Sequence, residues 1–156
     1  LANLKPGHVV EFRAPFGSFV LPETALQPQV LLTGGIGITP FISMVEYWVD
    51  KKLDFPLKLI ASYSTAQEII LKDMFEKFDR SHPKFEYIPT VTHPNSSRDG
   101  ETGRIGKDLL EKYIPDLRNC TYYIVGPQAM NIALSKLLET EEIPEENIRL
   151  EDFFGY

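Results

Sequence analysis

The chain has 156 residues, of which 43% are hydrophobic, and a formal net charge of -6. This length suits one domain with a substantial core, and the acidic balance gives no general footprint for nucleic acid or an anionic membrane. No apolar run reaches the length of a membrane span, and Cys120 is the only cysteine, so an internal disulfide is impossible. With no signal-peptide layout, the cytoplasm is the default location.

Two short strands are expected near the beginning of the chain, at residues 9–13 and 18–21, each bounded by proline and glycine turns. Two short strands do not form a stable sheet by themselves. Residues 1–26 are therefore interpreted as the end of an all-β unit whose beginning is missing, and residues 22–28 as a linker.

Residues 30–40, with the sequence VLLTGGIGITP, organise the rest of the chain. They combine a buried strand, three glycines within four positions and a proline, which is favoured in the first turn of a helix. Apolar residues then recur with helical spacing at positions 41, 44, 45, 48 and 49. A strand, a glycine turn and a helix N-terminus in this order predict an anion site, because unpaired N–H groups and the positive end of the helix dipole converge there.

The spacing of this motif departs from a dinucleotide fingerprint. It has Gly35 and Gly37 in place of the first two glycines, but Pro40 in place of the third. A simple strand-to-helix corner without a ligand is the alternative interpretation of this stretch alone.

Strands and helices alternate after this motif. Further strands are expected at residues 57–63, 85–92, 121–125 and 148–150, with helices at about 66–79, 105–113 and 130–138. Alternation predicts an α/β fold with a doubly wound, parallel, five-stranded sheet of order 3-2-1-4-5. This order places the strand that contains Pro89 at an edge and puts both glycine turns, after strands 1 and 4, at the topological switch point.

Four ordered motifs resemble the ferredoxin–NADP reductase family of flavin-dependent oxidoreductases. They are the 34–40 loop, the VGPQAM segment at 125–130, the EDF segment at 151–153, and the LKPGH and PFGSF segments near positions 4–8 and 15–19. The resemblance implies an NAD(P)-binding domain at residues 27–156, preceded at 1–26 by the last strands of a truncated flavin-binding barrel. It also implies that this chain is a fragment that is inactive alone. The chain departs from the family at position 125, where valine replaces the family's cysteine.

The same resemblance assigns roles to individual residues. The cofactor-binding positions that it implies, together with those expected at the ends of the strands, are Gly34, Gly35, Ile36, Gly37, Ile38, Thr39, Pro40, Ser64, Gln67, Arg104, Gly126, Pro127 and Tyr156. The catalytic positions are Glu151, Phe153 and Thr39, with Phe153 or Tyr156 stacking on the flavin. Alternatives stay open for two of them: Thr39 as a helix N-cap and Arg104 as a surface arginine. Met130, in the second motif, is interpreted as a core residue, because it fits the apolar stripe of its helix. The three histidines lack metal-ligand spacing, and no metal is expected.

The end of the second strand is where such folds distinguish NADH from NADPH. Residues 62–67 contain neither an acidic residue nor an arginine, and Glu68 is expected to begin a helix. This pattern favours NADH, with Ser64 and Gln67 contacting the ribose. Lys72 is the candidate phosphate contact if the cofactor is NADPH.

The predicted function is that of the NAD(P)H-binding domain of a flavin-dependent reductase, in which NADH or NADPH gives a hydride to FAD or FMN. A missing flavin domain and an unidentified electron acceptor are the implied partners. The alternative is a nucleotide-binding regulatory or interaction module without redox turnover, which would not need Glu151 and Phe153.

Overall fold

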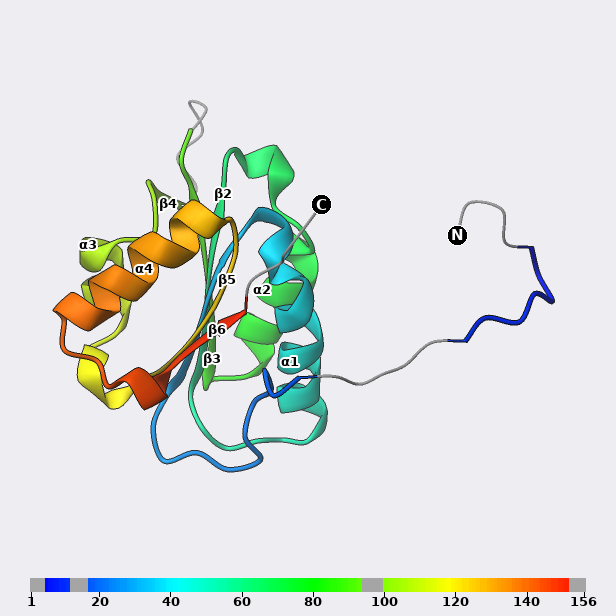
Figure 1. Cartoon of the computed structure of the whole chain (residues 1–156), viewed down its shortest axis with the longest axis horizontal. Coiled ribbons are helices and arrows are strands. Elements are labelled where there is room, and N and C mark those ends of the chain that lie inside the picture. The colour runs from blue at the N-terminus through cyan, green and yellow to red at the C-terminus, as the bar shows by residue number, and fades with distance from the viewer. Residues whose placement is uncertain (1–4, 12–16, 94–99, 152–156) are drawn as a thin grey trace.

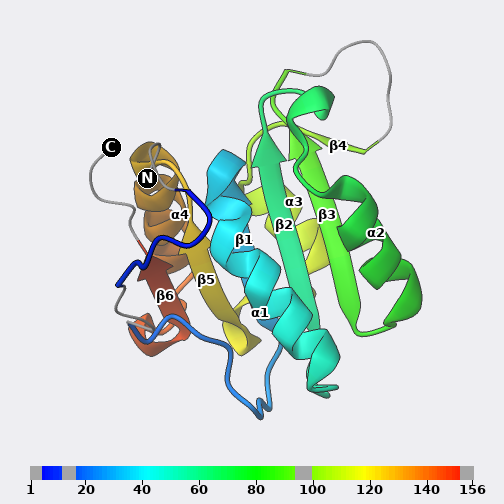
Figure 2. The ribbon, with the colours of Figure 1, turned by 90° about the vertical axis from the view of Figure 1, so that its right-hand side faces the viewer.

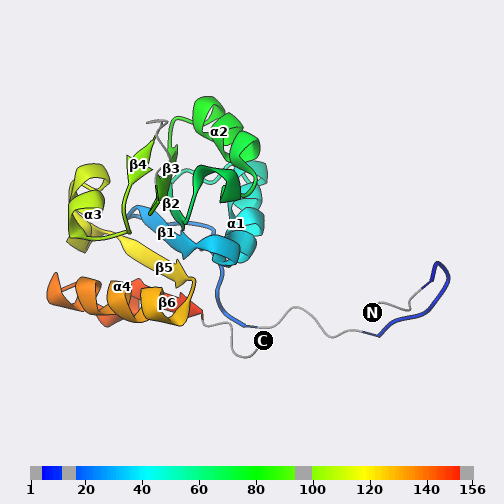
Figure 3. The same cartoon turned by 90° about the horizontal axis from the view of Figure 1, so that it is seen from above.

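The computed structural model describes residues 5–11, 17–93 and 100–151. A parallel sheet separates two pairs of helices, so the fold has three layers (Figures 1 and 3). Helices α1 (Thr39–Asp50) and α2 (Lys72–Ser81) cover one face, and helices α3 (Lys107–Tyr113) and α4 (Gln128–Thr140) cover the other. This arrangement confirms the doubly wound α/β fold.

The sheet has six strands in the order β4-β3-β2-β1-β5-β6, and all neighbouring pairs are parallel. The strands are β1 (Gln29–Gly34), β2 (Leu57–Tyr63), β3 (Phe85–Val91), β4 (Glu101–Thr102), β5 (Thr121–Val125) and β6 (Ile148–Glu151). The five expected strands therefore have the expected order. All six residues of β1 and all five of β5 are buried, as expected for central strands covered on both faces.

Four α-helices and four short 3-10 turns connect the strands. The helices are α1 (Thr39–Asp50), α2 (Lys72–Ser81), α3 (Lys107–Tyr113) and α4 (Gln128–Thr140), and the turns are η1 (Gly35–Ile38), η2 (Ala66–Glu68), η3 (Leu117–Asn119) and η4 (Glu145–Asn147). Each face of the sheet has its own apolar core. One core contains Phe41 and Trp48 of α1, and the other contains Leu110 of α3 and Leu138 of α4.

Three details of the sequence interpretation need correction. The sixth strand, β4, lies within the segment expected to be a polar loop and pairs with Thr90 and Val91, so β3 is not the edge strand at its carboxyl end. The pairing with β4 begins at Thr90, so Pro89 itself has no partner residue on β4. The strands expected at 9–13 and 18–21 are absent from the described residues there, where no neighbouring strand offers hydrogen bonds.

The third correction concerns the helix expected from residue 66. Leu71 adopts a positive φ of 52° and separates the turn η2 from α2. Leu71 is consequently exposed, and Phe75 is the buried anchor of α2. On α4, Ala133 is exposed, while Asn131 is buried.

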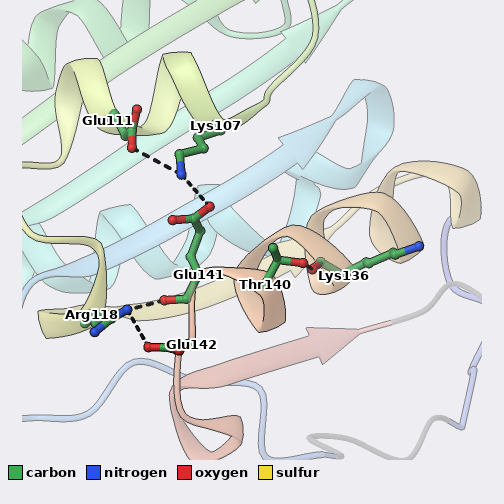
Figure 4. Close-up of polar contacts among 7 residues, drawn as sticks. All are labelled: Lys107, Glu111, Arg118, Lys136, Thr140, Glu141 and Glu142. Carbon is green, nitrogen blue, oxygen red and sulfur yellow. Dashed lines mark hydrogen bonds and ion pairs between the residues drawn. The ribbon is translucent and has the colours of Figure 1, made fainter.

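Side-chain contacts tie together the amino-terminal edge of the sheet. The Gln27 amide nitrogen donates to Thr121 Oγ1 at 2.8 Å and to Asn147 Oδ1 at 3.2 Å, which joins the starts of β1, β5 and β6. Figure 4 shows ion pairs from Arg118 to Glu142 at 2.5 Å and from Lys107 to Glu141 at 2.7 Å, which hold the end of α4 against η3 and α3.

Among the described residues, no helix is both long and apolar enough to cross a bilayer. The same part of the chain contains no group of three or more His, Cys, Asp or Glu side chains arranged to hold a metal ion.

Candidate functional site

The two glycine turns meet at the carboxyl edge of the sheet. Strands β1 and β5 are paired so that Thr33 lies beside Val125, and both turns follow directly. A Cβ atom placed on Gly126 would lie 3.2 Å from the Gly34 nitrogen and 2.4 Å from the Met130 methyl group. Such close approach brings the ends of β1 and β5 and the first turn of α4 together around one point.

Gly35 and Gly37 serve different purposes. Gly35 has φ +54°, and a Cβ placed on it would have no atom within 4 Å. Its backbone is therefore open to a ligand. Gly37 is buried, and a Cβ there would lie 2.4 Å from the Val125 carbonyl oxygen and 2.9 Å from Thr33 Oγ1. The structural need for glycine at position 37 is therefore contact with β5.

The start of α1 differs from a simple N-cap. Ile38 is the N-cap residue, and Thr39 and Pro40 are the first helical residues. The Thr39 hydroxyl donates to the Ile36 carbonyl oxygen at 2.7 Å, and the Thr39 N–H bonds to the same oxygen. This N–H already has a partner within the turn, so it is not free to donate to a ligand.

A cavity of about 390 Å³ lies beside these turns, at the carboxyl ends of β1 and β2 and against α4. Among the predicted cofactor-binding residues, it brings together Gly34, Gly35, Ser64, Arg104 and Pro127. Its apolar wall comes from α4 and includes Met130, Ala133 and Leu134. Met130 both lines this cavity and packs against the α3–α4 core.

The remaining predicted positions lie outside this lining. Ile36, Gly37, Ile38 and Thr39 lie in or beyond the turn, and Gln67 is exposed on η2. Pro40 instead borders a different hollow, with Phe19 and Tyr47.

The polar lining is sparse. Ser62 and Ser64 come from the end of β2, and Glu68 and Arg104 are the charged side chains that line the cavity among the described residues. Tyr63 is also among the lining residues, but its side chain belongs to the core on the α1 and α2 face, where burial raises the pKa of the phenol. A cavity with few polar groups and one acidic and one basic side chain suits an uncharged ribose next to a phosphate.

Glu151 lies at the carboxyl end of β6, paired with Val125. It is half-buried and lines a separate hollow of about 340 Å³ with Arg149 and residues 17–19. Glu151 is therefore one strand away from the glycine turns. The other predicted residues at this end, Phe153 and Tyr156, lie outside the described residues.

Sequence reasoning missed several lining residues, among them Ser62, Tyr63, Glu68 and Thr92. The expected helix from residue 66 concealed Glu68. An acidic side chain within a few residues of the end of the second strand was the available signal.

A parallel sheet with glycine turns and a cavity at its switch point defines a nucleotide-binding α/β domain. The sequence profile of the oxidoreductase NAD-binding domain family matches residues 31–136. The chain belongs to this family.

Similar relatives include one component of the Na(+)-translocating NADH-quinone reductase of several bacteria. The protein of Klebsiella pneumoniae is 32% identical over 160 residues, and that of Psychrobacter cryohalolentis is 31% identical. Each match covers 98% of this chain. The chain spans only 39% and 38% of the length of these relatives, respectively.

Solved structures confirm the fold. Amycolatopsis cytochrome P450 reductase GcoB superposes with a TM-score of 0.79 at 22% identity, covering 95% of this chain and 46% of the reductase. A ferredoxin NADP+ reductase from Neisseria gonorrhoeae, solved with FAD and NADP, gives a TM-score of 0.68 at 22% identity over 82% of this chain and 56% of its own. The expected resemblance to ferredoxin–NADP reductases is thereby confirmed.

Proposed function

We propose that this domain binds NADH at the carboxyl edge of its sheet and presents the nicotinamide to a flavin. The observation that carries the proposal is the cavity of about 390 Å³ beside Gly35, whose backbone has φ +54° and open space before it. Glycine at this position lets a pyrophosphate approach the main chain, next to the start of a helix. The residues present therefore fit the adenosine diphosphate half of a dinucleotide.

The relatives support the part of the proposal that concerns the flavin. When bound, the nicotinamide supplies a hydride and a flavin, FAD or FMN, accepts it. The Klebsiella relative is named for NADH, which agrees with a preference for NADH over NADPH. The flavin would be held by a separate flavin-binding domain, and electrons would pass on to an acceptor.

The chain's own residues would bind and orient the reactants. Gly126 and Pro127 would form one wall of the nicotinamide pocket, because Gly126 approaches Gly34 closely at the switch point. Glu151 would lie near the contact between nicotinamide and flavin, at the end of the neighbouring strand. Phe153 or Tyr156 would stack on the flavin, as the family resemblance implies.

A calorimetric titration of the 156-residue chain with NADH and with ADP-ribose tests this proposal. Both ligands should bind saturably and compete, because they share the adenosine diphosphate group. The matched variants are Ala133→Trp, whose bulk would fill the cavity, and Ile132→Trp, on the neighbouring exposed position outside that cavity. Loss of binding in the first variant alone is expected. Absence of saturable binding to the unaltered chain, or equal loss in both folded variants, would refute the proposal.

A further inference from the structure

Strand β6 leaves one edge of the sheet open. It ends the strand order, and β5 is its only pairing partner among the strands of the described residues. Figure 2 shows β6 and β4 at opposite edges of the sheet. The main-chain N–H and C=O groups on the outer side of an edge strand can pair with a strand of another chain.

An apolar patch borders this open edge on the side of α4. Leu150 of β6 is 46% exposed, and Ile132 of α4 is 61% exposed. Both side chains line a hollow of about 450 Å³ between α4 and β6. A second surface that covered the patch would remove apolar area from water, which favours association.

The other face of the same strand carries two charges of opposite sign. Arg149 and Glu151 flank Leu150 in the strand, so they point to the opposite face of the sheet. The Arg149 guanidinium carbon lies 5.5 Å from the centre of the Tyr123 ring, which belongs to the core covered by α1. Within the described ranges, neither Arg149 nor Glu151 forms an ion pair. A partner could therefore supply opposite charges without breaking a pair within the chain.

This strand is complementary to a second copy of itself. When two copies of β6 lie antiparallel about a two-fold axis at Leu150, Arg149 of each copy faces Glu151 of the other. The two Leu150 side chains meet on the opposite face, each beside Ile132 of its own copy. Charged side chains at an edge normally oppose pairing with another copy, but opposite charges that face each other across two strands stabilise the pair.

We propose that two copies of this chain associate through β6, with their sheets joined edge to edge in this antiparallel register. The four residues of β6 and the patch of Leu150 and Ile132 form a small interface. A small interface gives a weak dimer, with a Kd of about 10 to 100 μM. The contact lies outside the cavity beside Gly35, so this inference does not depend on the proposed cofactor site.

Sedimentation equilibrium of the 156-residue chain without ligand, from about 5 to 500 μM, tests the proposal. The unaltered chain should change from monomer to dimer over this range. Arg149→Glu and Glu151→Arg should each weaken dimerisation at least about tenfold, because each variant places like charges together twice in the symmetric dimer. The combined variant restores opposite charges in reversed order, and its Kd should return to within about threefold of that of the unaltered chain. The matched controls are Arg80→Glu on α2 and Glu46→Arg on α1, which make the same charge changes at exposed positions and should leave the Kd unchanged.

The contrary outcomes are distinct. A monomer at every concentration would overturn the proposal and leave this edge to a different partner, such as the flavin-binding domain. A dimer that the single variants weaken no more than their controls would overturn it by placing the contact elsewhere on the surface. Weakening in both single variants without recovery in the combined variant, with all three folded by circular dichroism, would overturn the register centred on Leu150.

Discussion

The two edges of the sheet are built differently. At the amino-terminal edge, Gln27 joins three strand starts, and Arg118 and Lys107 pair with the glutamates after α4. At the carboxyl edge, glycines bring the backbones of β1 and β5 together, and a cavity lies beside them. The first edge is fixed by contacts between side chains, while at the second edge glycines leave part of the backbone uncovered.

This difference indicates where a ligand can contribute binding energy. At the amino-terminal edge, Gln27, Lys107 and Arg118 already have protein partners. At the carboxyl edge, Gly35 faces open space and one oxygen of Glu68 is unpaired among the described residues. A polyanionic ligand with hydroxyl groups would complete that edge.

The largest expected effect comes from Gly37→Ala. The new Cβ would lie 2.4 Å from a main-chain oxygen of Val125, which cannot move without displacing β5. We expect the free energy of unfolding to fall by at least about 2 kcal/mol. Urea unfolding measures this loss. Gly35→Ala is the control, because a Cβ at position 35 meets no atom within 4 Å although the backbone there has a positive φ. An equal or larger loss in the control would contradict the assigned roles of the two glycines.

Gly35→Asn should separate binding from folding. Asparagine tolerates the left-handed conformation at φ +54°, so the free energy of unfolding should change by less than about 1 kcal/mol. Its side chain would occupy the approach to the main chain, and the Kd for NADH should rise about tenfold, equivalent to about 1.4 kcal/mol. Titration calorimetry on the folded variant measures the change. Unchanged NADH affinity would remove Gly35 from the pyrophosphate site.

Gly126→Ala should have a smaller effect on stability. The new Cβ would meet the Met130 methyl group at 2.4 Å, but that group ends a flexible side chain. We expect a loss of about 1 kcal/mol in the free energy of unfolding. In a double-mutant cycle, Met130→Ala should reduce this loss, because it removes the obstructing group. Strictly additive losses would show that contact with Gly34, and not with Met130, limits the site.

The smallest effect is a pH dependence at Glu101, the first residue of β4. Hydrogen bonds from Lys112 and Tyr113 lower the pKa of the Glu101 carboxyl group. Because the pKa is lower in the folded state, these contacts stabilise the fold at neutral pH, and this contribution is lost as the pH falls through the depressed pKa. Urea midpoints from about pH 6 to pH 3 should fall less steeply in Glu101→Gln. Parallel curves for the two proteins would show no such contribution.

The strand order could be predicted because apolar runs and helical periodicity alternate along the chain, and the glycine turns marked the switch point. Strand β4 could not be predicted, since it has two residues within a polar segment and depends on pairing with Thr90 and Val91. The separation of η2 from α2 could not be predicted either, because leucine rarely adopts the positive φ that Leu71 has here.

The candidate site was predicted in part. Gly34, Gly35, Ser64, Arg104 and Pro127 line one cavity, as their places at strand ends and loops suggested. Spacing alone could not reveal that Gly37 is required by β5, because a glycine kept free for a ligand and one pressed against a neighbouring strand look alike in a sequence. The place of Glu68 beside the cavity was missed because the expected helix from residue 66 is interrupted at Leu71, which leaves Glu68 in the separate turn η2.

The most direct test of the account is a ¹H–¹⁵N NMR titration of the 156-residue chain with NADH, after assignment of the backbone amides. The account predicts saturable shift changes at the carboxyl edge, with Gly34, Gly35, Ser64, Glu68 and Gly126 among the affected amides, and little change at the amino-terminal edge around Arg118 and Asn147. Shift changes centred on the amino-terminal edge, or no saturable change at any amide, would contradict it.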